Sequence, residues 1–554
     1  MKKALCVTIA LLMTLFAVSC GGTGGTTADS TQSQSQSVNT GSAEPATDKS
    51  VTAQESSGDF QIATSDGEFT NSGNVYTITK AGTYTLTGYL EGQILVNSDS
   101  DSDIVIELAG TTITCSTDSP IKILAGGDVD ISAKKDTENV INDTRSEKTS
   151  EDDSQGEGAI YAKTDLKLKG TGTLVVNAGY NNGVHTTKDL TIQKLSLKST
   201  APNNALRGGD SVEIKSGTVV AISTKGDGVK TANTDADKSG QTRGDILIES
   251  GAVTVYAAGD GFSAAHNFVM TQGEDGAATV AIYTGSYSGY TASDASVSSY
   301  KGIKVQNLLS VEAGSLILNC YDDGLHADYG TVFEDGTKGQ GTVTVSGGSI
   351  TASVYSPENK TAGGRSGPGR WGGQTAVAGA DAIHADSQLN ISGGTIVIDS
   401  AYEGLEANVI NVSGGSTTVS ANDDGVNACK GIATPAINVT GGYLDVTVSP
   451  SGDTDGIDSN GSYTQSGGVV ITRGPSSEMA AALDADGTVK ISGGTLIVLG
   501  YGKVTASGSV KSCSLSVHSA GTHTVKIDGV SYTFTNSSAY GRTYCYSDAS
   551  VSGT

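Results

Sequence analysis

The feature that most constrains this chain is a short sequence motif, here called a word, that recurs about every 22 residues. NGVHT, NALRG and DGVKT place Val184, Leu206 and Val229 at intervals of 22 and 23 residues. DGLHA, DAIHA, EGLEA and DGVNA continue the series, and the longer intervals contain visible insertions. The apolar positions of the series are Val184, Leu206, Val229, Phe262, Ile303, Leu325, Ile383, Leu405, Val426, Ile457 and Leu483. A repeat of this length indicates a solenoid.

A second pattern keeps the same period. LNISGGTIVI, INVSGGSTTV and INVTGGYLDV each join two short alternating runs through a Gly-Gly turn. Alternation with a period of two indicates strands and not helices. A hairpin sandwich is the alternative, but it predicts pairing across each turn and not the return of nearly identical words. We therefore predict an all-β, single-stranded parallel β-helix with about 22 residues per coil and roughly 12 coils.

Composition agrees with stacked coils. Glycine accounts for 75 of 554 residues, tryptophan for 1, and the apolar share is 36%. Such a chain cannot build a thick aromatic core, whereas aliphatic residues stacked inside a narrow tube can still form a continuous one. In this arrangement Leu325 and Ile383, which are 58 residues apart, would lie on neighbouring coils once the intervening insertions are looped out.

The N-terminus has the features of an export signal. Two lysines precede an apolar run that ends in AVSC, which resembles a bacterial lipobox with Cys20 as the lipidated residue. A plain signal peptide with an incidental cysteine is the alternative. We expect an extracellular protein on the cell surface that contacts the membrane only through its lipid anchor. The predicted parts are a lipoprotein signal peptide (1–20), a disordered tether (21–58), the β-helix (59–500) and a β-rich C-terminal cap (501–554).

Cysteine gives little further information. Five cysteines follow the lipobox, an odd number without a CxxC pair of the metal-binding type: Cys115, Cys320, Cys429, Cys513 and Cys545. Cys513 and Cys545 could form a disulfide in an exported chain, and the sequence leaves this open.

Oxygen-rich side chains follow each apolar position of the repeat. If Leu325 points inward, strand alternation turns His326 and Asp328 outward, and the same phase turns Glu406 and Asn408 outward. Carboxylates repeated at ~4.8 Å repel each other unless a proton, a hydrogen bond or a cation intervenes. Calcium accepts six to eight such oxygens. The predicted ligands are Asp323, Asp328, Asp381, Asp386, Glu403, Glu406, Asp423, Asp424, Asp453, Asp455 and Asp458.

Two alternatives to calcium stay open at these positions. Acids and amides at coil corners also cap the stack by hydrogen-bonding to backbone. The other alternative is zinc, bound through His326 and His384 with Asp328 and Asp386.

The formal charge of −25 argues against nucleic acid as a partner and favours cations, neutral ligands or anions bridged by a cation. We expect a monomer.

The order of motifs resembles a known family. DDGLHAD, DAIHAD, YEGLEAN, DDGVNA, GGYLDV and SGDTDGIDSNGSYTQSGG are similar, in that order, to secreted bacterial carbohydrate-binding domains with a right-handed parallel β-helix like that of polysaccharide lyases. The resemblance covers residues 60 to 500. It implies a right-handed helix that contains calcium and binds plant-type polysaccharide, cellulose or pectic acid. Lys301 and Asn204 stand where the family would show an acid.

Three functions fit this sequence. For a polysaccharide-binding protein, Trp371, Arg365, Arg370 and Tyr300 are the candidate sugar contacts. The second function is a calcium-dependent uronate lyase, in which Lys304 or Lys230 would act as the base. The third is a surface scaffold or adhesin, since many repeat proteins bind other proteins on their outer faces.

Overall fold

The computed structural model describes residues 51–149, 155–355, 379–477 and 479–553. Within these ranges the chain forms strands and two short 3-10 helices, η1 (Gly285–Ser288) and η2 (Ala292–Asp294), and no α-helix. No helix in the described part of the chain is long and apolar enough to cross a membrane. The prediction of an all-β protein is confirmed.

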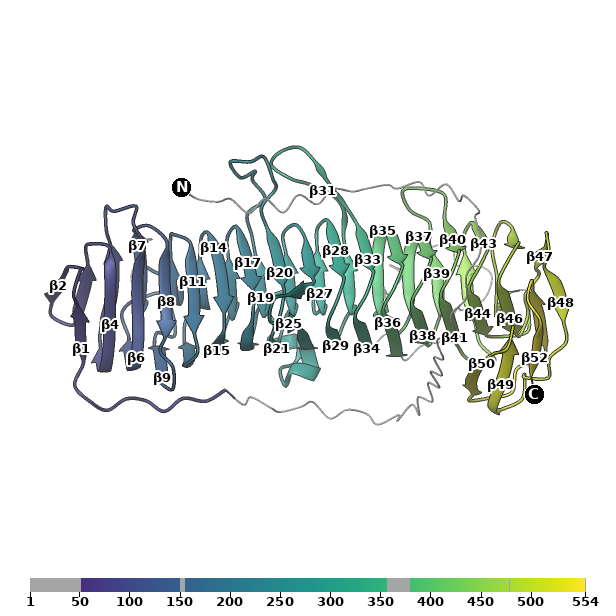
Figure 1. Ribbon diagram of the computed structural model, residues 1–554, viewed down its shortest axis with the longest axis horizontal. Helices are drawn as coiled ribbons and strands as arrows, with labels where there is room; N and C mark the ends of the chain where they lie inside the picture. The colour runs from purple at the N-terminus through teal and green to yellow at the C-terminus, as the bar shows by residue number, and fades with distance from the viewer. Residues whose placement is uncertain (1–50, 150–154, 356–378, 478, 554) are drawn as a thin grey trace, which may run out of the picture. The chain divides into compact units, whose positions relative to one another are not determined.

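Most strands stack in three parallel sheets, and each coil contributes one strand to each sheet in turn (Figure 1). The first sheet contains the words of the repeat. It comprises β3 (Val75–Ile78), β5 (Gln93–Asn97), β7 (Ile121–Ala125), β10 (Gly158–Ala162), β13 (Asn182–Thr186), β16 (Leu206–Gly208), β19 (Val229–Thr231), β22 (Phe262–Ala264), β27 (Ile303–Val305), β30 (Leu325–Ala327), the first parts of β35 (Ile383–Ile391) and β37 (Leu405–Val412), β39 (Val426–Ala428) and β42 (Ile457–Ser459).

The second and third sheets stack in the same way. The second sheet comprises the first parts of β4 (Gly82–Glu91) and β6 (Ile104–Cys115), β8 (Val129–Ala133), β11 (Leu166–Gly170), β14 (Asp189–Gln193), β17 (Ser211–Ile214), β20 (Asp245–Ile248), β23 (Phe268–Met270), β28 (Leu308–Val311), β33 (Thr342–Val345), the second parts of β35 and β37, β40 (Ala436–Val439), β43 (Ser462–Gln465), β45 (Val489–Ile491) and β47 (Thr505–Ala506). The third comprises the second parts of β4 and β6, β9 (Glu138–Asp143), β12 (Thr173–Ala178), β15 (Leu195–Ala201), β18 (Gly217–Ser223), β21 (Ala252–Ala257), β26 (Thr279–Thr284), β29 (Ser315–Cys320), β34 (Ser349–Val354), β36 (Thr395–Ser400), β38 (Ser416–Ser420), β41 (Tyr443–Thr447), β44 (Val469–Arg473) and β46 (Thr495–Leu499).

The repeat positions form the core. Leu325 pairs in register with Ile303 on one side and with Ile383 on the other, and all three side chains are fully buried. The insertion between Leu325 and Ile383 includes the hairpin of β31 (Tyr329–Val332) and β32 (Lys338–Gln340), which lies outside the three sheets. Residues remote in sequence therefore become neighbours on successive coils, as the spacing predicts, in the arrangement of a parallel β-helix.

The Gly-Gly words occupy the turn between the second and third sheets. Gly394 has a φ of 77°, a left-handed conformation that favours glycine. A Cβ on its neighbour Gly393 would lie 2.2 Å from the carbonyl oxygen of Ser346 on the preceding coil. The pair is needed because one glycine makes the turn and the other lets two coils approach closely.

Both ends of the stack carry antiparallel strands. Near the N-terminus β1 (Gln61–Thr64) pairs with β4, and β2 (Phe69–Ser72) pairs with β3. At the other end β51 (Thr543–Ser547) pairs antiparallel with β46 and with β48 (Lys511–Cys513), and Cys513 forms a disulfide with Cys545. The remaining strands are β49 (Gly521–Ile527), β50 (Val530–Asn536) and β52 (Val551–Gly553), with a small hairpin of β24 (Gln272–Gly273) and β25 (Gly276–Ala277) further upstream. The disulfide that the sequence left open is present.

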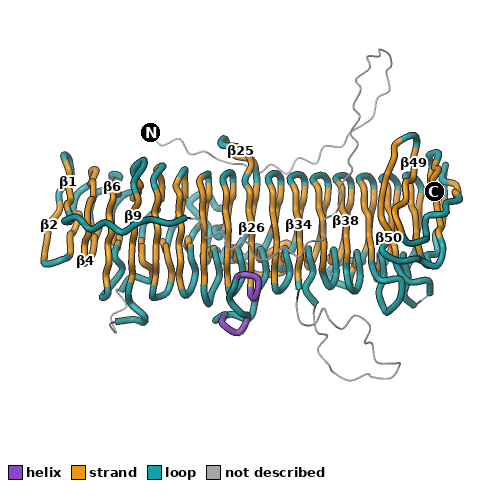
Figure 2. The backbone as a smooth tube through the Cα atoms, turned by 90° about the horizontal axis from the view of Figure 1, so that it is seen from below, coloured by secondary structure: helices purple, strands orange, loops and turns teal. Residues whose placement is uncertain are grey.

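Residues 51–58 lie against the third sheet, although the tether was predicted to extend through 58 (Figure 2). Val51 is 5% exposed and packs with Val220, Tyr256 and Tyr283. The backbone N–H of Ser56 donates to Thr112 Oγ1 at 2.8 Å. Apolar contact and hydrogen bonding thus hold the end of this segment on the outside of the helix.

Candidate functional site

One line of outward side chains runs along the first sheet, one residue from each coil. We call it the outer file; in register order it contains Lys122, Tyr161, His185, Arg207, Lys230, Ser263, Lys304, His326, His384, Glu406, Asn427 and Asp458. The part before His326 is mainly basic and aromatic, whereas the part after His384 is acidic or amide. The second residue of each word is thus in register from coil to coil, but only the file from Arg207 onward is partly exposed, since Lys122, Tyr161 and His185 are buried.

Acids at the corner before most of the later first-sheet strands form a second line, which Lys301 interrupts. Asp323 Oδ1 accepts the backbone N–H of Asp381, and Asp424 Oδ1 accepts that of Asp455, both at 2.8 Å. Asp260 Oδ1 accepts the backbone N–H of Lys301 in the same way. The stack-capping role that the sequence left open is thus present, and it uses one oxygen of each of these carboxylates.

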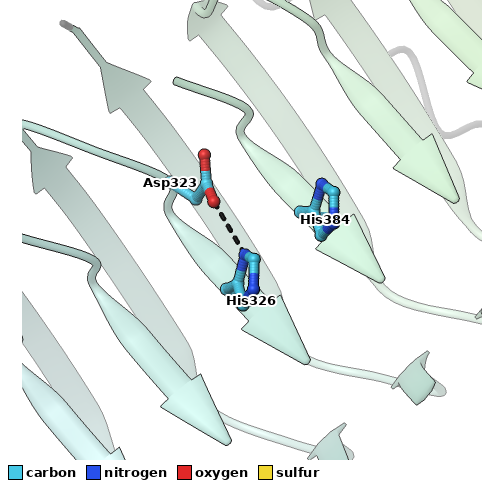
Figure 3. Close-up of side chains that lie close together, drawn as sticks. All are labelled: Asp323, His326 and His384. Carbon is cyan, nitrogen blue, oxygen red and sulfur yellow. Dashed lines mark hydrogen bonds and ion pairs between the residues drawn. The ribbon is translucent and has the colours of Figure 1, made fainter. Parts of the chain in front are cut away.

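The two histidines of the outer file stack on each other (Figure 3). The rings of His326 and His384 lie 4.5 Å apart between centroids and are inclined by only 7°. His326 Nδ1 is 2.7 Å from Asp323 Oδ2, and its Nε2 is 2.9 Å from Asp328 Oδ1. Although burial opposes the charge of Asp328, the hydrogen bond with His326 lowers the pKa of that carboxyl to about 2.

His384 is surrounded by three carboxylates. Its Nδ1 lies 2.8 Å from Glu406 Oε2 and 3.2 Å from Asp381 Oδ2, and its Nε2 lies 3.2 Å from Asp386 Oδ1. Burial disfavours a charged ring, but these hydrogen bonds outweigh it and raise the pKa of His384 well above its ordinary value. For Glu406 burial is likewise outweighed by His384, so the pKa of Glu406 falls to about 2. Burial raises the pKa of Asp381 despite the same histidine.

The acidic end of the site concentrates negative charge. Burial and then Asp423 raise the pKa of Asp424 to about 8, while burial and the charge of Asp458 raise the pKa of Asp455 to about 7 against a backbone hydrogen bond that lowers it. Glu403 has a strongly raised pKa from burial and from the neighbouring carboxylates. Glu403, Asp424, Asp455 and Asp458 thus lie near one another, with Asp453 near Asp455.

Two buried oxygens in the same region have no hydrogen-bond partner among the described residues. They are Thr454 Oγ1, on a residue only 1% exposed, and Asn427 Oδ1. Asn427 pairs in register with Asp458, and its amide nitrogen donates to Glu403 Oε2. Both oxygens are of a kind that calcium accepts as ligands. Sequence reasoning assigned no ligand role to Thr454 or Asn427.

Asn408 is not exposed on the outer face, so the expectation that it offers a ligand oxygen there is wrong. The residue is fully buried, and its amide bonds to the backbone of Cys429 and Ala433. A Cβ on Gly431 would lie 2.9 Å from the Asn408 side chain, so the segment that follows β39 covers it.

The two candidate lysine bases are held in ion pairs. Lys230 Nζ lies 2.8 Å from Asp227 Oδ2, and Lys304 Nζ lies 3.5 Å from Asp328 Oδ2. Each ammonium group is thus engaged by a carboxylate of the protein itself. This geometry gives the lyase interpretation no support.

Of the predicted sugar contacts, the structure describes only Tyr300. Tyr300 is half-buried and makes an edge contact with Tyr321, whose ring in turn contacts Tyr355 at 6.3 Å. Trp371, Arg365 and Arg370 lie outside the described residues, as does Cys20. Tyr321 and Tyr355 were not among the predicted sugar contacts, because only the stacking of coils brings them beside Tyr300.

Comparison with known proteins bears on this surface. Residues 72–342 match the family model described as carbohydrate-binding domain-containing protein. The resemblance to a carbohydrate-binding family is confirmed. A protein of Acetivibrio thermocellus with the same description is 38% identical over 117 residues, or 21% of this chain and 41% of that relative. The chain thus spans about two fifths of the relative's length.

A solved structure shows a more distant similarity. It is titled as the polysaccharide lyase-like protein from C. thermocellum, gadolinium derivative, and is 28% identical with a TM-score of 0.38. The match covers 45% of this chain and 91% of that chain. The matched family segment ends at residue 342, so the acidic end of the outer file lies beyond it.

Proposed function

We propose that this chain is an exported, lipid-anchored protein that binds polysaccharide along the outside of a right-handed β-helix. The observation that carries the proposal is the match of residues 72–342 to a carbohydrate-binding family. Cys20 would carry the lipid anchor, and the protein would be a monomer. Its ligand would be a plant cell-wall polymer such as cellulose or pectic acid. A long stack of equivalent coils suits a long, regular polymer, because both repeat along one axis.

The aromatic run of Tyr300, Tyr321 and Tyr355 is the proposed sugar contact. Their rings follow one another at 5.8 and 6.3 Å, and each is partly accessible. Aromatic faces offer apolar surface to the C–H groups of a sugar, and the tyrosine hydroxyls can bond to its hydroxyls. Trp371, Arg365 and Arg370, the other candidate sugar contacts, follow Tyr355 in the sequence.

We also propose that calcium binds at the acidic end, with Asp424, Asp455 and Asp458 as ligands. Two findings support this: the raised pKa values of Asp424 and Asp455, and the unpartnered oxygens of Thr454 and Asn427. A cation that accepts many oxygens relieves both the repulsion and the missing hydrogen bonds. Asp423 and Asp453 lie beside these residues and would complete the set.

Affinity gel electrophoresis tests both parts. The protein is run through gels that contain a neutral β-glucan or polygalacturonate, with calcium or with EDTA. We expect retardation in both polymers, and a loss in EDTA that affects only the acidic one, because a protein of net charge −25 repels uronates without a bridging cation. The variant Tyr300→Ala/Tyr321→Ala should reduce retardation, whereas Tyr89→Ala, an exposed tyrosine in β4, should not. The absence of retardation by any glycan would overturn the proposal.

A further inference from the structure

Asp381, His384 and Glu406 converge on one point of the outer file. Asp381 and His384 lie three residues apart on one coil, and Glu406 comes from the next. One ligand atom from each of these side chains lies within 4.8 Å of the other two. Glu406 Oε2 and Asp381 Oδ2 both face His384 Nδ1. Asp381 is 6% exposed, while the side chains of His384 and Glu406 are 18% and 19% exposed, so the point is sheltered but accessible.

Three ligand atoms can face this point. His384 Nε2 lies 3.2 Å from Asp386 Oδ1, so the hydrogen on Nε2 can stay in place while Nδ1 binds a metal ion through its lone pair. Glu406 Oε2 and Asp381 Oδ2 lie 2.8 and 3.2 Å from Nδ1. Without a metal ion a proton on Nδ1 bridges these atoms, and a dication that replaces this proton would be bound by all three side chains.

The pairing of His384 with Asp386 is itself typical of metal sites. A histidine that binds a metal through one nitrogen usually donates its other N–H to a carboxylate, which fixes the tautomer and the ring orientation. In this chain Asp386 would be that carboxylate. The sequence-based zinc hypothesis made Asp386 a ligand, whereas the geometry assigns it the orienting role and moves the ligands to the Nδ1 side.

The neighbouring histidine is a weaker candidate although its surroundings look similar. Asp323, His326 and His384 also each offer a ligand atom within 4.8 Å of the other two (Figure 3). Lys301 Nζ, however, is 2.6 Å from Asp323 Oδ2. An ammonium group already supplies the positive charge there, and it would repel a dication.

We propose that Asp381, His384 and Glu406 bind a transition-metal dication of the zinc class. One imidazole and two carboxylates suit zinc, and three protein ligands leave a fourth position for water or an external ligand. Calcium is disfavoured here because it prefers oxygen ligands. The Cys429 thiol, which hydrogen-bonds to Glu406, adds a soft donor at the edge of the site. This site shares no ligand with the proposed calcium site at Asp424 and Asp455.

Zinc affinity is measured by competition with a chromophoric chelator, in millimolar calcium so that any calcium site stays filled. The purified wild-type protein is compared with His384→Gln, Glu406→Gln and His326→Gln. We expect His384→Gln and Glu406→Gln to weaken zinc binding roughly 100-fold or more, a larger loss than outer partners of a metal site cause. His326→Gln, the matched control on the adjacent coil, should stay within about threefold because its partner Asp323 is already paired.

Two further readouts make the test decisive. Cobalt(II) should give the visible absorption of a low-coordinate site in wild type and in His326→Gln, and not in His384→Gln. Asp386→Asn should weaken zinc binding by about 10- to 100-fold, as expected for an orienting residue. Circular dichroism checks that each variant is folded. Zinc binding that is absent in wild type, that survives His384→Gln, or that His326→Gln impairs equally would overturn the proposal.

Discussion

Replacement of Asp424 by Asn tests whether the acidic end of the outer file needs a cation. Asp424 Oδ1 accepts the backbone N–H of Asp455 at 2.8 Å, and an asparagine oxygen can accept the same bond. The substitution therefore keeps the stack-capping contact and removes one negative charge. Burial, with Asp423 next, raises the pKa of Asp424 from 3.8 to about 8, so this charge is costly in the fold.

The sign and size of the effect follow from this pKa. A carboxyl whose pKa is higher in the folded state binds its proton more tightly there, so it destabilises the fold progressively as pH rises from about 4 through about 8. The difference between the two pKa values corresponds to at most about 6 kcal/mol above pH 8. Asp423, Asp455 and Asp458 share the same repulsion. We therefore expect Asp424→Asn alone to raise the free energy of unfolding by about 1–3 kcal/mol at pH 8 without calcium.

Denaturant unfolding at pH 8 and pH 5, in EDTA and in millimolar calcium, is the assay. In EDTA Asp424→Asn should be more stable than wild type at pH 8 and nearly equal to it at pH 5. In calcium the wild type should be the more stable protein, because it keeps the Asp424 carboxylate and so binds the ion more tightly in its folded state than the variant does. Asp101→Asn, at an exposed loop position, is the control and should change neither result. A variant that is less stable than wild type in EDTA at pH 8, or a wild type indifferent to calcium, would refute the reasoning.

Three further predictions concern the fold. Leu325→Ala should lower the free energy of unfolding by about 2–5 kcal/mol in denaturant titrations, because it removes a fully buried core side chain; a loss below about 1 kcal/mol would contradict the stacked core. Val51→Asp should release residues 51–58 from the third sheet, so limited proteolysis should cut there faster while the helix stays protected; unchanged cutting would show that Val51 does not hold the segment. Cys513→Ser/Cys545→Ser should cost about 2–4 kcal/mol, and hydrogen exchange should rise in β48 and β51 but not at the N-terminal end; uniform exchange would argue against a local effect.

The fold could be predicted because one geometric rule generates most of it. A word that returns at a fixed interval stacks on itself, so the burial of Leu325 and its contact with Ile383 follow from their place in the repeat. The same rule placed His326 and His384 on one face. It failed at Asn408, because the segment after β39 that covers this residue lies outside the repeat.

The contacts of individual side chains could not be predicted from the repeat. The spacing put Asp323 and Asp381 in equivalent positions, yet only Asp323 pairs with Lys301. The reason is that Lys301 occupies the corner of the coil that precedes Asp323. The contact of residues 51–58 with Tyr256 was also missed, since nothing in a polar segment indicates which distant surface it will meet. The repeat determines which residues lie beside each other on successive coils. Which of these residues form ion pairs depends on single positions where the sequence departs from the repeat.

The order of charges along the outer file gives the surface a direction. Arg207, Lys230 and Lys304 offer cations toward one end, and Glu406 and Asp458 offer anions toward the other. Lys230 and Lys304 are already paired with Asp227 and Asp328, so a polyuronate that spans the whole file would meet little free positive charge over the first stretch and repulsion over the second. A dication bound at the acidic end would then fix where along the file the polymer attaches, and the polymer would leave with the ion.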